Sequence, residues 1–243
     1  MRPIRWTVPL ALACALAAGL ATAAAGQVNC VNPPRGEIDL EGPHIRVGDA
    51  VWAGPTAQVI VKWVDKDGSP PTTQALSRSR EDLDAFASRP GSVPVVKICE
   101  NAASIQPLAF AVDAAAPELT WEVVDLDKFP NRRREARNPK GLSWSGGAKW
   151  LPLKVDGEAV RIGSDTPQLL LHGARFDIDG SSVAPNGDQM LRVRFRDSGA
   201  GVDHLSFRVL RGSGDHMTLE IETADLVGNA RTVKWGIDAA EKK

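Results

Sequence analysis

Two short acidic segments have the composition of a cation-binding loop. Residues 65–68 and 177–180 both read Asp-x-Asp-Gly. Calcium needs several oxygen ligands at one point, and some calcium loops begin in this way. Asp177, Asp179 and Asp188 form the better candidate metal cluster, although the final glutamate of an EF-hand loop is missing. Because Asp-Gly is also a strong hairpin signal, a simple turn is the alternative, and whether calcium binds stays open.

The tryptophans fall into two groups. Trp144 and Trp150 flank a Gly-rich stretch at 145–149, which could present two indoles for sugar stacking or for a protein partner. The alternative is that they cover one end of the core. Trp121 and Trp235 stand in segments of alternating apolar residues, which predicts that both belong to the core.

One dense basic run contains Arg132, Arg133, Arg134 and Arg137, between neighbours rich in proline and asparagine. Clustered arginines suit an anionic surface such as lipid head groups or an acidic glycan. The alternative is a solvated loop.

No catalytic residues are predicted. A serine hydrolase of the nucleophile-elbow type needs Gly-x-Ser-x-Gly, which is absent, and 212–214 is better interpreted as a turn. His204 and His216 each follow an aspartate, but a hairpin turning near 211–215 would separate them by about 20 Å. The sequence therefore favours a protein that is not an enzyme.

The first 25 residues have the layout of a secretory signal peptide. Arg2 and Arg5 precede an apolar run over 8–21, and small residues close the segment. We expect cleavage near Ala25 and a periplasmic or secreted protein. Because the run is shorter than the roughly 20 strongly apolar residues of a membrane span, no transmembrane segment is expected in the mature chain.

Cleavage would leave two cysteines, Cys30 and Cys99, because Cys14 lies in the removed segment. An even pair in an oxidising compartment predicts a disulfide, with two buried free thiols as the alternative. Cleavage also removes two of the 29 basic residues and none of the 30 acidic ones. The resulting mild excess of acid gives no electrostatic footprint for nucleic acid.

Period-two alternation of apolar and polar residues predicts an all-β chain. The pattern is clearest in the last third, around 189–196, 205–209, 217–221 and 233–237, where segments rich in glycine and aspartate separate the runs. Further strands are expected in both halves of the chain: 37–40, 44–47, 58–64, 93–99, 119–123, 149–153, 159–162 and 168–171. One short helix is predicted after Ser79, with Asp82 at the capping-box position.

The chain resembles bacterial immunoglobulin-like proteins over about residues 107–238. The resemblance rests on Val-Asp followed by Ala-Pro at 112–117, on Asp-Ser-Gly-Ala-Gly-Val at 197–202, and on Ala-Asp-Leu-Val-Gly-Asn at 224–229. It implies two tandem antiparallel β-sandwiches, an N-terminal one over 26–111 and a C-terminal one over 112–238, followed by a tail at 239–243. The chain contains no tyrosine, so the tyrosine corner of antibody-type domains cannot form.

These features together predict an exported, non-catalytic immunoglobulin-like protein that acts as a cell-envelope interaction or structural module. Its expected partner is another envelope protein or a surface glycan. A carbohydrate- or calcium-binding module is the first alternative, and a hydrolase or enzyme accessory domain is the second. A sandwich fold by itself carries no function.

Overall fold

The computed structural model describes residues 35–64, 72–88, 97–98, 101–102, 105–128, 141–147, 149–213 and 216–239. Over these residues the chain is mostly β-structure in several antiparallel sheets, which confirms the predicted all-β fold class. The predicted signal peptide, both cysteines of the predicted disulfide and the four clustered arginines lie outside the described residues.

The N-terminal half forms small sheets from short strands. Strands β5, β4, β1 and β8 lie side by side in a four-stranded sheet, while β2, β3 and β9 form a three-stranded one and β6 pairs with β7. The bounds are β1 (Arg35–Glu41), β2 (His44–Val47), β3 (Ala50–Ala53), β4 (Gln58–Val64), β5 (Thr72–Ala75), β6 (Lys97–Ile98), β7 (Asn101–Ala102), β8 (Ile105–Gln106) and β9 (Ala111–Val112). The β1–β8 and β3–β9 pairs are parallel and the other pairs are antiparallel.

Among the described residues of this half, one apolar cluster forms the core. Val59, Val61 and Trp63 of β4 are buried at alternate positions and pack with residues of β1 and β3 and with Leu83. Leu83 is fully buried and belongs to helix α1 (Arg80–Ala87), which begins where the sequence predicts. The side chain of Ser79 caps this helix by accepting a hydrogen bond from the Asp82 N–H at 3.2 Å.

The C-terminal half is built from two larger antiparallel sheets. One has five strands in the order β10-β17-β14-β11-β12, and the other has six in the order β13-β18-β19-β20-β15-β16. The bounds are β10 (Glu118–Asp125), β11 (Ser143–Ser145), β12 (Leu151–Pro152), β13 (Val160–Gly163), β14 (Gln168–His172), β15 (Ala174–Ile178), β16 (Ser181–Val183), β17 (Gln189–Arg196), β18 (Val202–Arg211), β19 (Met217–Asp225) and β20 (Ala230–Ala239), with the 3-10 helix η1 (Leu126–Lys128) after β10.

The two sheets pack face to face as a sandwich. Leu191, Val193 and Phe195 alternate along β17 on the inner face of the five-stranded sheet. They share one core with residues of the six-stranded sheet, among them Phe207 and Trp235, which are 1% and 3% exposed. The predicted alternation in the last third of the chain therefore marks the two faces of real strands.

The outer face of the five-stranded sheet carries a smaller apolar cluster. Val124, Leu170 and Met190 point away from the sandwich core, and Leu126 and Trp150 pack over them. Alternation along β14 explains the split, because Leu169 and Leu171 enter the core while Leu170 lies on the other side.

Two predictions about individual residues are decided by the strands. Trp235 lies in the core as expected, but Trp121 is 38% exposed, so its assignment to the core was wrong. The reason is its place on β10, an edge strand of the five-stranded sheet where the inner face is not fully covered. Alternation predicts the face of a strand, but it does not reveal which strand stands at an edge.

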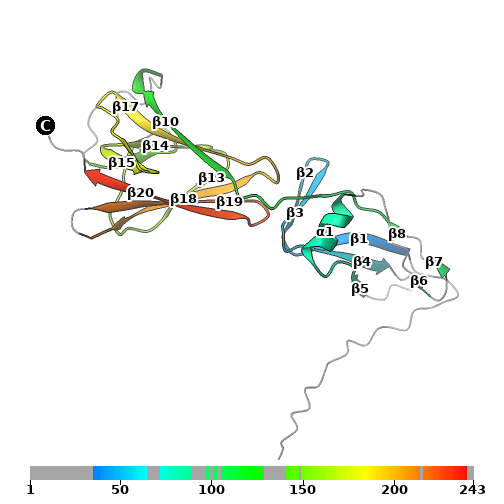
Figure 1. Cartoon of the computed structure of the whole chain (residues 1–243). Coiled ribbons are helices and arrows are strands. Elements are labelled where there is room, and N and C mark those ends of the chain that lie inside the picture. The colour runs from blue at the N-terminus through cyan, green and yellow to red at the C-terminus, as the bar shows by residue number, and fades with distance from the viewer. Residues whose placement is uncertain are drawn as a thin grey trace, which may run out of the picture.

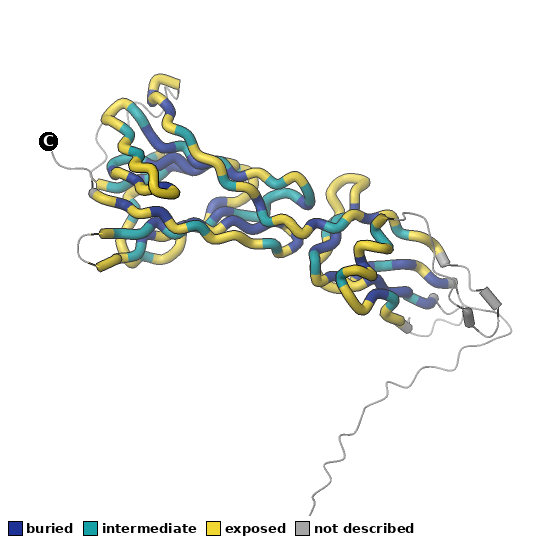
Figure 2. The backbone as a smooth tube through the Cα atoms, in the orientation of Figure 1, coloured by how far each residue is buried: buried dark blue, intermediate teal, exposed yellow. Residues whose placement is uncertain are grey.

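Figure 1 shows the two halves lying end to end, with the segment between β9 and β10 joining them. Figure 2 shows buried positions running along the strands inside each half, separated by the exposed connecting loops. Among the described residues, no helix has the length and apolar character needed to cross a membrane.

Candidate functional site

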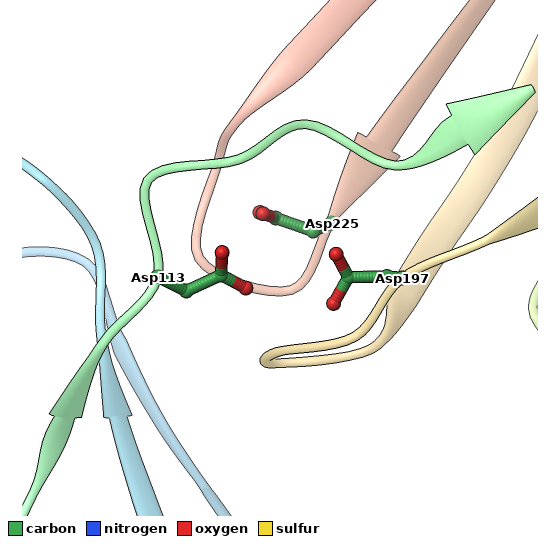
Figure 3. A group of neighbouring side chains, drawn as sticks. All are labelled: Asp113, Asp197 and Asp225. Carbon is green, nitrogen blue, oxygen red and sulfur yellow. The ribbon is translucent and has the colours of Figure 1, made fainter.

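Three aspartates meet where the two halves join. Asp113, Asp197 and Asp225 each offer a carboxylate oxygen within 4.8 Å of the others, and Figure 3 shows the three side chains pointing toward one another from three separate segments. We call this group the junction cluster. Asp113 and Asp225 are 5% and 3% exposed, and Asp197 is half-buried. Burying carboxylates so close together is costly unless each finds hydrogen-bond donors or a cation.

Asp113 supplies the contacts that cross the junction. Its own N–H donates to the Ala53 carbonyl in β3 at 2.9 Å, which ties it to the N-terminal half. Its Oδ2 accepts a hydrogen bond from the Ala200 N–H at 2.7 Å, and its carbonyl accepts one from Asn229 Nδ2 at 3.0 Å. Since Ala200 and Asn229 lie in two loops of the C-terminal sandwich, one residue is bonded to both halves.

Asp197 organises the β17–β18 loop. Its Oδ2 accepts hydrogen bonds from the N–H groups of Gly199 at 3.0 Å and Gly201 at 2.6 Å. Gly201 has a φ of +94°, a backbone conformation that glycine adopts without strain. The fold of this loop aims the Ala200 N–H at Asp113, so the glycines of the 197–202 segment serve the junction.

Asp225 does the same for the β19–β20 loop. Its Oδ1 accepts from the N–H groups of Val227 at 2.9 Å and Asn229 at 2.8 Å, and its Oδ2 accepts from Asn229 Nδ2 at 2.6 Å. Gly228 turns the chain with a φ of +91°. The Asn229 amide therefore bridges Asp225 to the carbonyl of Asp113.

The backbones at the junction are in close contact. A Cβ on Gly199 would lie 2.1 Å from Asp113 Oδ2, which no structure tolerates without movement. A Cβ on Gly54, which follows β3, would lie 2.6 Å from the carbonyl oxygen of Val227 in the β19–β20 loop. Glycine at these two positions allows the two halves to touch.

The junction cluster has the donor set of a hard-cation site. Calcium is bound by carboxylate and carbonyl oxygens, and each carboxylate oxygen has two lone pairs, so an oxygen that accepts one N–H can still reach a cation. Backbone N–H groups and the side-chain amide of Asn229 donate hydrogen bonds to the three carboxylates and so stabilise their negative charge. The cluster therefore works as a clasp, and it could also hold a cation.

The metal candidates predicted from the sequence are arranged differently. Asp179 and Gly180 form the tight turn between β15 and β16, with φ values of +51° and +80°, as the hairpin alternative predicts. Asp177 faces solvent on β15 and Asp188 is exposed before β17. Within the described part of the chain, the acidic group close enough to share an ion is the junction cluster and not these three residues.

The two predicted ligand-binding tryptophans pack against different parts of the C-terminal sandwich. Trp144 lies in β11, half-buried, with its ring 5.0 Å from that of Phe207 in an edge-to-face contact. Trp150 covers the outer cluster of the five-stranded sheet and lies 5.8 Å from the His172 ring. This placement supports the packing alternative, while sugar binding by the pair stays a prediction.

Unpartnered polar atoms gather beside Trp150. The Oγ of Ser143, the Nε1 of Trp150 and both ring nitrogens of His172 are buried and have no hydrogen-bond partner of good geometry. Ser143 and His172 are opposite each other on β11 and β14. Burial lowers the pKa of His172 below its ordinary value, and the nearby Gly187 backbone opposes only part of that shift. The imidazole is therefore held neutral.

A cavity of about 300 Å³ in the N-terminal half is lined by polar and apolar side chains together, among them Asp39, His44, Arg46 and Leu108. Burial by itself would raise the pKa of Asp39, but the ion pair with Lys62 and the Leu40 N–H outweigh it and lower the pKa. Asp39 is consequently ionised at neutral pH, which suits a counter-ion better than a proton donor.

No protein-family model matches the chain, and neither the curated proteins nor the solved structures contain a match. The fold and the junction cluster define an all-β protein in which a two-sheet sandwich is joined to smaller sheets through an acidic clasp.

The sequence motifs that carry the immunoglobulin-like resemblance contain all three aspartates of the junction cluster. The sequence shows each of these aspartates inside a separate motif, and nothing in the motifs predicts that the three side chains meet. The feature that could have indicated the cluster is the aspartate at the first or second position of each of the three motifs.

Proposed function

We propose that the chain is an exported, non-catalytic immunoglobulin-like protein that serves as a structural or interaction module of the cell envelope. The observation that carries this proposal is the double attachment of Asp113, whose backbone bonds to Ala53 and whose carboxylate bonds to Ala200. A junction held in this way fixes the orientation of the two halves. Fixed orientation suits a protein that spaces or presents binding surfaces.

Burial at the junction supports the same role. Val227 is 2% exposed and its carbonyl approaches Gly54 of the other half, while Asp113 and Asp225 are also buried. Interfaces between domains of one chain are often small and allow relative motion. Here hydrogen bonds to buried carboxylates add orientation that an apolar contact alone does not give.

Two measurements test this function. Cell fractionation should recover the mature chain outside the cytoplasm, with an N-terminus near residue 26, and small-angle scattering of that chain should fit one fixed arrangement of the two halves. An uncleaved chain in the cytosol would contradict export. Scattering that requires a wide range of interdomain angles would contradict a spacer or presenting role.

Calcium binding is the second candidate function, and the specific observation that favours it is the 4.8 Å convergence of the three carboxylates. A cation that binds only the folded chain must raise its stability. On this proposal, calcium raises the thermal midpoint of the wild type and a chelator lowers it again. The Asp225→Asn variant should lose the response, whereas Asp188→Asn, at the position predicted from the sequence, should keep it. A wild-type midpoint indifferent to calcium and chelator rejects the proposal.

A further inference from the structure

Among the described strands, β10 is a long edge strand that is paired on one side alone. It pairs with β17 over eight consecutive residue pairs without a register shift and forms the end of the five-stranded sheet. Within the described sheets the other edge strands are β2, β5, β6, β7, β8, β9, β12, β13 and β16, and each has two to four residues. The open side of β10 therefore presents the longest row of unpaired backbone groups among these edges.

Natural proteins usually protect such an edge. They shorten it, bend it with a bulge, or place lysine or proline on it, because an open edge can pair with another chain. Residues 118–125 contain no lysine and no proline, and the pairing with β17 is regular along the whole strand. The charges of Glu118, Glu122 and Asp125 are the one protection of this kind on the strand, and without lysine, proline or a bulge the edge is suited to pairing.

The inner face of β10 is apolar and only partly covered. Leu119, Trp121 and Val123 lie opposite Phe195, Val193 and Leu191 of β17, so they share the face that points into the sandwich. Trp121 is 38% exposed and Val123 is 39% exposed. An added strand beside β10 would cover both side chains.

We propose that β10 is the surface through which two copies of this chain associate, by antiparallel pairing of β10 with β10 about a two-fold axis at Trp121. In this register Trp121 lies opposite Trp121 of the second copy, and Leu119 lies opposite Val123 of the second copy. Leu119 and Val123 lie at equal distances on either side of Trp121. In this register the apolar faces of the two strands therefore lie on the same side of the joined sheet and form one continuous apolar surface.

The outer-face charges fit the same register. Glu122 is already held by Arg192 at 2.6 Å and Arg194 at 3.1 Å, and it would lie opposite Thr120 of the second copy. Glu118 would lie opposite Val124 of the second copy. No like charges are placed directly opposite each other along the paired residues 118–124, which avoids the largest electrostatic penalty of self-pairing. Glu122 is a diagonal neighbour of Glu118 and Glu122 of the second copy, and its ion pairs with Arg192 and Arg194 offset that repulsion.

Analytical ultracentrifugation of the mature full-length chain over a range of concentrations tests this association. We expect a monomer–dimer equilibrium, and Trp121→Glu should raise the dissociation constant of the dimer roughly thirtyfold, the effect of losing a central tryptophan. Because Trp121 is partly exposed, this variant should keep its fold, which the thermal midpoint checks. Val47→Glu is the matched control, since Val47 is 47% exposed on β2, and it should leave the equilibrium unchanged.

Cross-linking tests the register while leaving Trp121 intact. An oxidised mixture of the Thr120→Cys and Glu122→Cys variants should form disulfide-linked pairs, because these positions face each other across the axis. A mixture of Thr120→Cys and Glu118→Cys should not, since these positions are about 14 Å out of register. Wild type is treated alongside to show any linkage through its own cysteines. A chain that stays monomeric, a dimer that Trp121→Glu leaves intact, or equal cross-linking in both mixtures overturns the proposal.

Discussion

The Asp113 carboxylate accepts a hydrogen bond from the Ala200 N–H at 2.7 Å, across 87 residues of sequence and between the two halves of the molecule. The donor is a backbone group in a loop shaped by Asp197. The acceptor belongs to the segment that leaves the N-terminal sheets. The conformation of the β17–β18 loop therefore helps to position the N-terminal half through Asp113.

Replacing Asp113 by alanine should destabilise the chain and loosen the junction. The substitution leaves the Ala200 N–H without its partner in a buried place, which costs about 1–3 kcal/mol in the free energy of unfolding. Denaturant unfolding measures this loss, and small-angle scattering should show a broader range of shapes. Asp188→Ala is the control, because Asp188 is exposed, and it should change stability by less than about 0.5 kcal/mol. Equal effects of both variants would contradict the role of Asp113.

Adding one methyl group at Gly199 should disturb the same contact from the other side. The new Cβ would lie 2.1 Å from Asp113 Oδ2, so either the loop or the aspartate must move. We expect Gly199→Ala to lower the free energy of unfolding by about 1–3 kcal/mol. Gly187→Ala serves as the matched control, since its Cβ would meet nothing within 4 Å.

A double-mutant cycle separates the clash at Gly199 from other effects of the added methyl group. In the Asp113→Ala background the carboxylate is gone, so Gly199→Ala should cost much less than it does in the wild type. Such coupling is expected for residues in direct contact. Additive losses would show that the cost of Gly199→Ala arises elsewhere in the loop.

The strands of the last third could be predicted because alternation is a local property of the sequence. The apolar residues at alternate positions of 189–196 predict which face of the strand is buried, and Ser79 and Asp82 predict the start of the helix. Whether a strand stands at the edge of a sheet depends on its pairing with distant segments and is not a local property. For this reason the sequence predicts Trp121 in the core, although its strand is an edge strand. Strand β11 has three residues, too few to show alternation, and the sequence predicts its Trp144 only as a residue that flanks the Gly-rich stretch at 145–149.

The junction cluster could not be assembled from the sequence for a related reason. Asp113, Asp197 and Asp225 are far apart along the chain, and each occurs in a motif that a turn alone explains. Spacing favoured Asp177 and Asp179, because carboxylates two positions apart look like a local ligand pair. Asp177 lies on β15, whereas Asp179 lies in the tight turn that follows, about 7 Å further along the chain. Loops at the same end of a sandwich, by contrast, can bring distant residues together.

Buried His172 should make the chain less stable in mild acid. Burial lowers the pKa of the folded-state imidazole below 6.5, whereas the unfolded chain keeps the ordinary value. Below pH 6.5 the unfolded state therefore binds a proton that the folded state resists, so the free energy of unfolding falls as the pH falls. The contribution of neutral His172 to the free energy of unfolding is fully present above pH 6.5. Thermal midpoints measured between pH 7.5 and 5 should decrease over this window.

The His172→Phe variant identifies the group responsible, since it removes the titration and keeps a ring beside Trp150. Its midpoint should vary less between pH 7.5 and 5 than that of the wild type. The carboxylates with lowered pKa, such as Glu220 beside Arg208, lose their charge only at more acidic pH and so lie outside this window. Val47→Phe is the control, because Val47 is 47% exposed and carries no titratable group, and it should keep the wild-type acid sensitivity. An unchanged slope in His172→Phe would assign the acid sensitivity to another group.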